Sequence, residues 1–249
     1  MAGHSHWANI QRTKGAADFK RGKLFSKLSR EIAMAARLGG GNPEFNPRLR
    51  AAIDAARSQS MPNDNIDRAV KKGSGELEGA SLEEMTYEGY GAGGVAFLVE
   101  CMSDNRNRTS ADVRAAFAKY EGHLAGAGSV SWMFHKKAVF TFASDRVSEE
   151  QLMEASLDAG AEDIRSQGGL LVIIAPFDRF DAVSTAIKKA GLVPDSAKPT
   201  FIPTNTSTVT TAESARLILD LYEALEDHDD VQNVHANFDI PDDILAALK

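Results

Sequence analysis

The sequence is poor in cysteine, in proline and in long apolar runs. Its 249 residues include a single cysteine, Cys101, and 8 prolines, which excludes a disulfide-stabilised scaffold and a proline-rich disordered chain. The longest nearly uninterrupted apolar stretch runs from Leu170 to Phe177, far shorter than the roughly 20 residues that a bilayer helix needs. The first ten residues carry polar side chains where an export signal needs an apolar run. We therefore expect a cytoplasmic globular protein with no membrane partner.

Acidic residues are scarce in the first part of the chain, although the formal net charge of the whole is −7. Residues 1–72 hold 14 Lys and Arg against 6 Asp and Glu, whereas residues 73–249 hold 14 against 29. This distribution predicts a basic N-terminal head on an acidic body. A basic unit of this kind is suited to binding a polyanion.

Helical periodicity is clear in the basic head. From Lys23 to Leu38, apolar residues recur on one side of a helix and four cations share the opposite stripe, namely Lys23, Lys27, Arg30 and Arg37. Asn46 followed by Pro47 predicts the start of a second helix, and Pro62 predicts a short third helix ending near Gly73. The glycine- and glutamate-rich segment 73–84 is typical of a linker.

Strand and helix patterns alternate beyond this linker. The expected strands are 95–100, 138–142, 164 with 170–175 as a hairpin, 192–195, 200–209 and 231–238, and the expected helices are 108–120, 148–159, 177–190 and 211–226. Residues 137–198 then have the β-α-β-β-α-β order of a split βαβ (ferredoxin-like) unit. The remaining elements are too few for a further independent unit, so they are expected to complete the sheet begun at Val95.

These patterns predict an α+β protein with an N-terminal three-helix domain followed by two α/β sandwich-like domains. The expected domains are residues 1–79, a discontinuous middle domain of residues 80–136 plus 199–249, and an inserted ferredoxin-like domain of residues 137–198.

Four segments of the chain follow a known family pattern. They are Gly3–Ile10 with Lys20–Lys23, Met61–Ile66, Tyr87–Gly91 running through Asp104–Thr109, and Asp230–Val234 with Asn237–Asp239. The whole chain thereby resembles the YebC family, whose mitochondrial relative is the translational activator of cytochrome c oxidase. The resemblance implies a three-domain, non-enzymatic protein. Members have long been labelled probable transcriptional regulators, with a competing role at the ribosome that eases synthesis of proline-rich stretches.

The candidate nucleic-acid-binding residues are mostly cations of the head. They are Trp7, Arg12, Lys14, Lys20, Lys23, Lys27, Arg30, Arg37, Arg68, Lys71, Lys72, Arg106 and Arg108. The cations could contact successive phosphates, and Trp7 could stack on an unpaired base. The alternative for the stripe is an ordinary solvated helix face, and the alternative for Trp7 is an anchor on the helical bundle.

Arg106 and Arg108 stand where a strand passes into a helix. Thr109 is expected to cap that helix in a Thr-x-x-Asp box, so the two cations oppose the helix dipole unless an anion partners them. An RNA phosphate could do so, and so could Glu88 or Glu100.

The sequence contains no recognisable catalytic motif. The glycines of Gly89–Gly94 match a dinucleotide fingerprint only by their letters, because they precede a strand instead of following one. Cys101 is expected to be a buried, inert thiol. His228 among Asp227, Asp229 and Asp230 contains possible metal ligands, but such a cluster is usually a solvated turn. We expect no catalytic residue, metal, cofactor or small-molecule substrate.

The leading hypothesis is therefore a nucleic-acid-binding regulator of gene expression, favoured as a ribosome-associated translation factor that contacts ribosomal RNA or tRNA through its basic head. One alternative is a DNA-binding transcriptional regulator. A second is a protein–protein adaptor that acts through the acidic domains.

Overall fold

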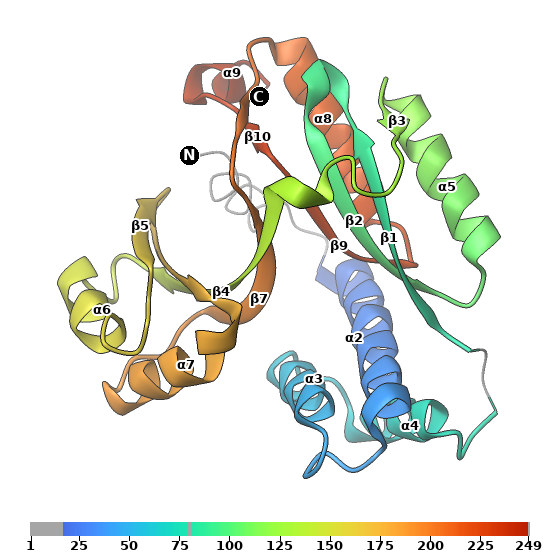
Figure 1. The fold of residues 1–249 in the computed structure, drawn as a ribbon, viewed down its shortest axis with the longest axis vertical. Coiled ribbons are helices and arrows are strands. Elements are labelled where there is room, and N and C mark those ends of the chain that lie inside the picture. Colours follow the sequence, from blue (N-terminus) through green and yellow to red (C-terminus); the bar gives the residue numbers. More distant parts are fainter. Residues whose placement is uncertain (1–16, 79–80, 249) are drawn as a thin grey trace.

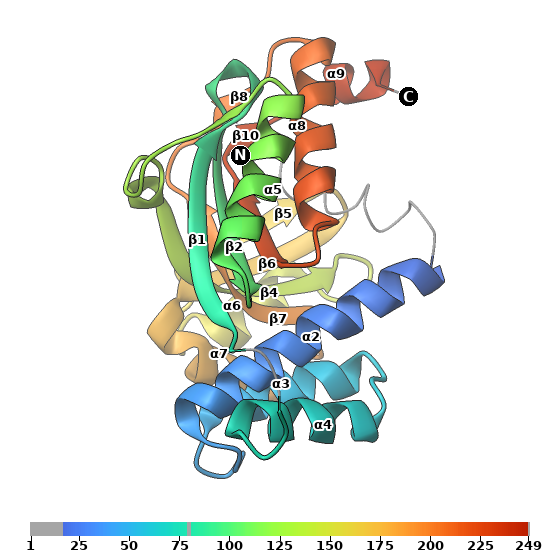
Figure 2. The same ribbon diagram turned by 90° about the vertical axis from the view of Figure 1, so that its right-hand side faces the viewer.

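The described part of the basic head, from residue 17 onward, is a bundle of three helices. The structure, a computed structural model, describes residues 17–78 and 81–248. The helices are α2 (Ala17–Gly39), α3 (Pro47–Ser58) and α4 (Asn63–Ser74) (Figure 1), and Figure 2 shows α3 and α4 beneath the longer α2. Asn46 caps α3 by accepting a hydrogen bond from the Leu49 N–H at 3.0 Å, as expected from the Asn-Pro start. The predicted three helices of the head are confirmed.

Small residues allow two of these helices to approach closely. A Cβ atom added to Gly73, in the last turn of α4, would lie 2.1 Å from the carbonyl oxygen of Ala33 in α2. The apolar core of the head lies at this contact and along α3. Its fully or nearly buried members are Ile32, Ala35, Ala36, Leu49, Ala52, Ile53, Ala56, Met61, Ile66 and Ala69.

The middle sheet is built from two distant parts of the chain. Its strand order is β3-β1-β2-β9, and its strands are β1 (Glu83–Tyr90), β2 (Ala96–Ser103), β3 (His123–Leu124) and β9 (Val231–Ala236). Helices α5 (Arg106–Lys119) and α8 (Ala212–Glu226) lie side by side on one face (Figure 2). Phe97 and Val99 of β2 point into the core beneath these helices. Smaller elements complete this region: η1 (Ala92–Gly94), β8 (Ser207–Thr208), β10 (Phe238–Asp239) and α9 (Asp242–Ala247).

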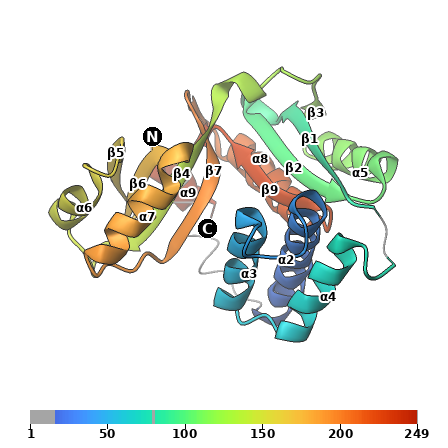
Figure 3. The ribbon, with the colours of Figure 1, turned by 60° about the horizontal axis from the view of Figure 1, so that its bottom comes forward.

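The residues between these two parts of the chain form a second antiparallel sheet. Its order is β5-β6-β4-β7, formed by β4 (Phe134–Ala143), β5 (Asp163–Gln167), β6 (Leu170–Pro176) and β7 (Ser196–Pro203). One face is covered by α6 (Glu149–Ser156) and α7 (Phe180–Lys189), as Figure 3 shows. Short 3-10 turns, η2 (Ser131–Met133) and η3 (Phe177–Arg179), precede β4 and α7. The order of elements matches the expected split βαβ unit.

The start of β4 and part of β7 pack against the face of the first sheet that α5 and α8 leave open. Val130 and Phe134 are buried against Ala96 and Leu98 of β2, and Phe201 of β7 joins this small cluster. The two faces of β2 are therefore both covered, one by helices and the other by the chain leading into β4. This explains the near-continuous apolar sequence of β2, whose residues are buried apart from the partly exposed Glu100.

The expected α+β class is confirmed, and several local expectations are corrected. Residues 192–195 do not form the last strand of the second sheet, because the strand is Ser196–Pro203. The segment 200–209, expected to be one strand of the middle sheet, is divided between β7 and β8. Strand β1 lies partly in the segment expected to be a linker. Alternating polar and apolar residues identify a strand but not the neighbouring strand with which it pairs. The bounds of these strands depend on that pairing, so the sequence pattern alone did not give them.

The second sheet and its helices contain a core of their own, which predicts independent folding. The buried cluster around Phe140, Leu152, Ile173 and Ile187 draws all its members from residues 138–192. A fragment spanning residues 134–203 is expected to unfold cooperatively in urea, with a free energy of about 3 to 5 kcal/mol for a unit of this size. Urea titration followed by circular dichroism checks this. A gradual, non-cooperative loss of signal would show that this unit depends on the rest of the chain.

Candidate nucleic-acid interface

A groove runs between α2, α4 and the start of the β1 segment. Its volume is about 690 Å³, and it is lined by Gly22, Phe25, Ser26, Ser29, Arg30, Ala33, Arg37, Asn65, Arg68, Ala69, Lys72, Gly73, Ser81 and Leu82. Half of these lining residues are small, namely Gly22, Ser26, Ser29, Ala33, Ala69, Gly73 and Ser81. Four of the lining side chains are cationic, and no lining residue within the described chain is acidic.

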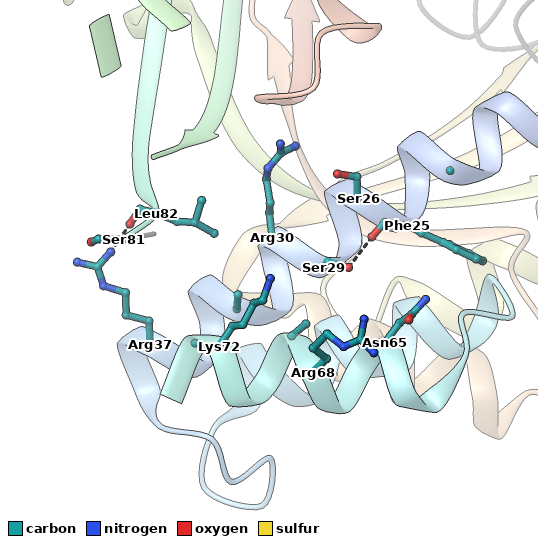
Figure 4. A pocket seen from close by; sticks show the side chains of 14 residues that line it. Phe25, Ser26, Ser29, Arg30, Arg37, Asn65, Arg68, Lys72, Ser81 and Leu82 are labelled. Carbon is teal, nitrogen blue, oxygen red and sulfur yellow. Dashed lines mark hydrogen bonds between the residues drawn. The ribbon is translucent and has the colours of Figure 1, made fainter. Parts of the chain in front are cut away.

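The four cations come from two helices. Figure 4 shows Arg30 and Arg37 on α2, with Arg68 and Lys72 on α4 across from them. Arg68 and Lys72 are one helical turn apart, so their side chains are neighbours on the helix surface. Both are exposed, and neither forms an ion pair with any residue that the structure describes. Arg37 donates a hydrogen bond to the carbonyl oxygen of Leu82.

The first part of the cationic stripe is turned toward the body of the protein. Lys23 Nζ lies 2.9 Å from the carbonyl oxygen and 3.2 Å from a carboxylate oxygen of Asp227. Lys27 Nζ donates to the carbonyl oxygen of Glu226 at 2.9 Å. The guanidinium of Arg30 donates to the carbonyl oxygen of Asp229. The three side chains thus contact the last residue of α8 and the turn that follows it.

Asp230 is the centre of a polar cluster below this contact. Its Oδ2 accepts hydrogen bonds from Ser103 at 2.9 Å, Thr109 at 2.8 Å and Arg108 at 3.0 Å. Arg30 Nη2 lies 3.5 Å from the other carboxylate oxygen. The carboxylate is almost completely buried, and although burial opposes ionisation, the hydrogen bonds from Arg108, Thr109 and Ser103 hold the pKa of Asp230 below its ordinary value. Two of the recognised sequence segments, 104–109 and 230–234, meet here.

This cluster gives Arg108 a carboxylate partner, though not an expected one. Arg108 pairs with Asp104 at 3.0 Å as well as with Asp230. The expectation that Glu88 or Glu100 serves this purpose is wrong. Glu88 instead accepts hydrogen bonds from the backbone N–H groups of residues 128, 130 and 131, and Glu100 lies 2.9 Å from the Nε2 atom of His235.

The helix that follows this strand is also capped differently from expectation. Asn105, not Thr109, is the N-cap of α5. Thr109 is buried and turns its hydroxyl to Asp230 and to the carbonyl oxygen of Asn105. The side chain of Arg106 is exposed and forms no ion pair in the described chain.

The candidate residues therefore divide into three groups. Arg30, Arg37, Arg68 and Lys72 line one groove, and Lys71 lies beside them, exposed on α4. Lys23 and Lys27, with Arg30, contact the body, while Arg106 and Arg108 lie at the start of α5. Trp7, Arg12 and Lys14 lie outside the described residues, and so does the side chain of Lys20.

Sequence reasoning missed the polar lining of the groove and the importance of the turn after α8. Ser26, Ser29 and Asn65 line the groove, and the available signal was that Ser26 and Asn65 lie one turn from cations on the same helices and that Ser29 precedes Arg30. The expectation of a solvated turn at residues 227–230 holds for Asp227 and Asp229, which are exposed, and is wrong for Asp230, which is buried.

Two further findings concern the described residues only. No three His, Cys, Asp or Glu side chains among residues 17–78 and 81–248 are close enough together to hold a metal ion. Within these same ranges, none of the helices combines the length and apolar character that crossing a membrane requires. Cys101 is buried as expected, and burial raises the pKa of its thiol to about 12.

The fold and the groove define a class of protein: an α+β chain in which a basic helical head precedes two sheet-containing units. Comparison with known families agrees with this description. Residues 5–76 match the TACO1/YebC protein N-terminal domain, and residues 82–238 match the TACO1/YebC second and third domain. The chain belongs to the TACO1/YebC family.

Relatives extend over the full length of the chain. A probable transcriptional regulatory protein of Idiomarina loihiensis is 56% identical over 250 residues, covering 100% of this chain and 99% of the relative. A probable transcriptional regulatory protein of Fusobacterium nucleatum is 49% identical and covers 100% of both chains. The crystal structure of a conserved hypothetical protein from Aquifex aeolicus has a TM-score of 0.88 at 47% identity, covering 96% of this chain and 99% of that one.

Proposed function

We propose that this protein is a non-enzymatic regulator of gene expression that binds RNA through its basic head and acts at the ribosome. The observation that carries the proposal is the groove, where Arg30, Arg37, Arg68 and Lys72 surround a space with no acidic residue in its described lining. Cations around a hollow of small residues suit phosphate groups of a folded RNA. The ribosomal role, which eases synthesis of proline-rich stretches, is what membership of the YebC family implies.

The shape of the head favours RNA over reading of a DNA operator. A helix-turn-helix protein contacts base edges through the N-terminal residues of its recognition helix. Helix α4 follows α3 after a short turn and could be compared to such a helix, but it has only 12 residues and carries Asp64 and Asp67 in its first half. Both carboxylates are exposed. Acidic groups at that position would repel the DNA phosphates on either side of the major groove.

Transcriptional regulation through DNA is the second candidate function. It is favoured by the names of the relatives, which are called probable transcriptional regulatory proteins. Crosslinking the protein in cells and treating the recovered complex with ribonuclease or with deoxyribonuclease separates the two. Destruction by ribonuclease alone is expected, and destruction by deoxyribonuclease alone would replace the proposal with the second candidate.

Removing two groove cations is expected to weaken RNA binding in a salt-dependent way. If Arg68 and Lys72 each neutralise a phosphate, the double variant Arg68→Gln with Lys72→Gln makes the negative slope of log affinity against log salt shallower by about 1.4 for single-stranded RNA. Fluorescence titration at several salt concentrations measures this slope. Both side chains are exposed, and glutamine is a good helix former, so the fold is expected to persist.

A matched control carries the same loss of charge elsewhere. Lys188 and Lys189 are exposed in the last turn of α7, on the second sheet unit. Their replacement by glutamine is expected to leave the slope unchanged. Equal shifts in both double variants would mean that net charge, and not the groove, determines binding.

A further inference from the structure

Three cations of α2 are occupied by contacts with the body. Lys23, Lys27 and Arg30 follow one another along one face of α2, and every one of them donates to an oxygen of residues 226–230. A side chain that donates to the body in this way is not available to a phosphate. The docked head therefore presents only part of its positive charge to a ligand.

The surface that receives these cations has the chemistry of a polyanion. Helix α8 has no basic residue in its last turn, and the carbonyl oxygens at a helix C-terminus lack partners within the helix and carry partial negative charge. Glu226 and Asp227 offer such carbonyls, and Asp227 and Asp230 add carboxylates. Like the backbone of a nucleic acid, this surface offers closely spaced oxygens that only accept hydrogen bonds.

The contact between the α2 cations and the end of α8 can be replaced by a contact with phosphates. Asp227 is 58% exposed in its pair with Lys23, and exposed ion pairs contribute little to stability because water and salt screen them. Lys27 loses hydration in the contact, and this burial lowers its pKa despite the nearby acids. A cation that is partly desolvated gains less from docking than its hydrogen bond suggests. A ligand rich in phosphate can therefore compete.

We propose that the acidic end of α8 and nucleic acid compete for Lys23, Lys27 and Arg30, so that the body holds the head in a closed, weakly binding state until nucleic acid displaces it. This regulation rests on the proposed function of the head. The groove residues Arg68 and Lys72 remain exposed in the closed state and make the first contact. Release of the body contact then adds Lys23 and Lys27 to the interface and frees Arg30, which already lines the groove, for a phosphate.

The closed state is tested by weakening the body's side of the contact. Asp227→Lys places a cation beside Lys23 while leaving every head residue unchanged, and lysine is well tolerated at a helix C-terminus. Affinity for unfractionated tRNA is expected to rise about fivefold, because a larger fraction of molecules is open. Asp158→Lys makes the same change of charge at an exposed site on the second sheet unit and is expected to leave the affinity near that of the unaltered chain.

Energy transfer between two dyes reports the opening directly. Cysteines introduced at the exposed positions Asp54 of α3 and Asp220 of α8 accept the dyes, whereas the buried Cys101 with its high pKa does not react. Transfer is expected to fall when tRNA binds the unaltered protein, toward the value that Asp227→Lys shows without tRNA.

The possible failures are distinguishable. If tRNA binds but transfer does not change, or if Asp227→Lys binds no more tightly than Asp158→Lys, the competition is wrong and the RNA-binding function still holds. If none of these proteins binds tRNA, the proposed function fails and the competition fails with it.

Discussion

The Asp230→Asn variant is expected to unfold with about 3 kcal/mol less free energy than the unaltered protein. The carboxylate is almost completely buried and accepts hydrogen bonds from Ser103, Thr109 and Arg108, joining the end of β2 to the start of α5. A neutral amide loses the charge and places an N–H₂ group where one of these donors points, and the loss of charge-assisted hydrogen bonds at a buried site is costly. Urea denaturation at neutral pH measures the difference.

The unfolding free energies of the unaltered protein and of Asp230→Asn are expected to converge in acid. Because the folded state holds the pKa of Asp230 below its ordinary value, its contribution to stability is present above the unfolded pKa of about 3.9 and is lost as the pH falls through the folded pKa. The asparagine variant has no such group, so the gap in unfolding free energy narrows in that range. Asp229→Asn is the control: this neighbouring side chain is exposed, and its replacement is expected to change stability by less than about 0.5 kcal/mol. A gap that stays constant down to strong acid would mean that the pKa of Asp230 is the same in the folded and unfolded proteins, so that its hydrogen bonds do not favour the ionised carboxylate.

Gly73→Ala is expected to destabilise the head by about 3 kcal/mol. The added methyl group would lie 2.1 Å from the carbonyl oxygen of Ala33 and 2.8 Å from its Cα atom. These are backbone atoms within a helix, so relief requires α2 and α4 to move apart, and that opens the core around Ile66 and Ala69. Loss of helical circular dichroism at lower urea concentration is the expected result.

Gly22→Ala is the matched substitution on α2. A Cβ atom at Gly22 has no neighbour within 4 Å, and alanine is favoured over glycine inside a helix by up to about 1 kcal/mol. This variant is expected to be slightly more stable than the unaltered protein. If both variants behaved alike, general helix propensity would account for Gly73 and the close contact with Ala33 would not.

The sequence alone indicated the elements whose signals are local. Asn46 and Pro47 predicted the start of α3, and the helix expected from residue 148 is α6, which begins with a capping box of Ser148 and Gln151. The hairpin between β5 and β6 followed from its two glycines and the flanking apolar residues. Each of these features depends on residues within a few positions of one another, so propensity and capping chemistry were sufficient.

The contacts between distant segments could not be obtained in this way. The periodicity of α2 showed that its cationic face lies away from the apolar core of the head. A face exposed to solvent and a face docked on acidic residues have the same sequence pattern, so the periodicity did not show what this face contacts. Lys23 and Asp227 are 204 positions apart, and no local rule relates them. Thr109 illustrates the same limit, because its capping pattern was present but its hydroxyl is used by the distant Asp230.

The division of the middle sheet between two parts of the chain has a consequence for biosynthesis. Strand β2 ends at Ser103, and its neighbour β9 begins only at Val231. At about 5 to 20 residues per second, β2 waits on the order of ten seconds for its partner to emerge. The head and the second sheet unit precede β9 in the chain and leave the ribosome first. During this interval the stripe on α2 has no acidic turn to dock against, so the nascent protein carries its full basic surface while it is still attached to the ribosome.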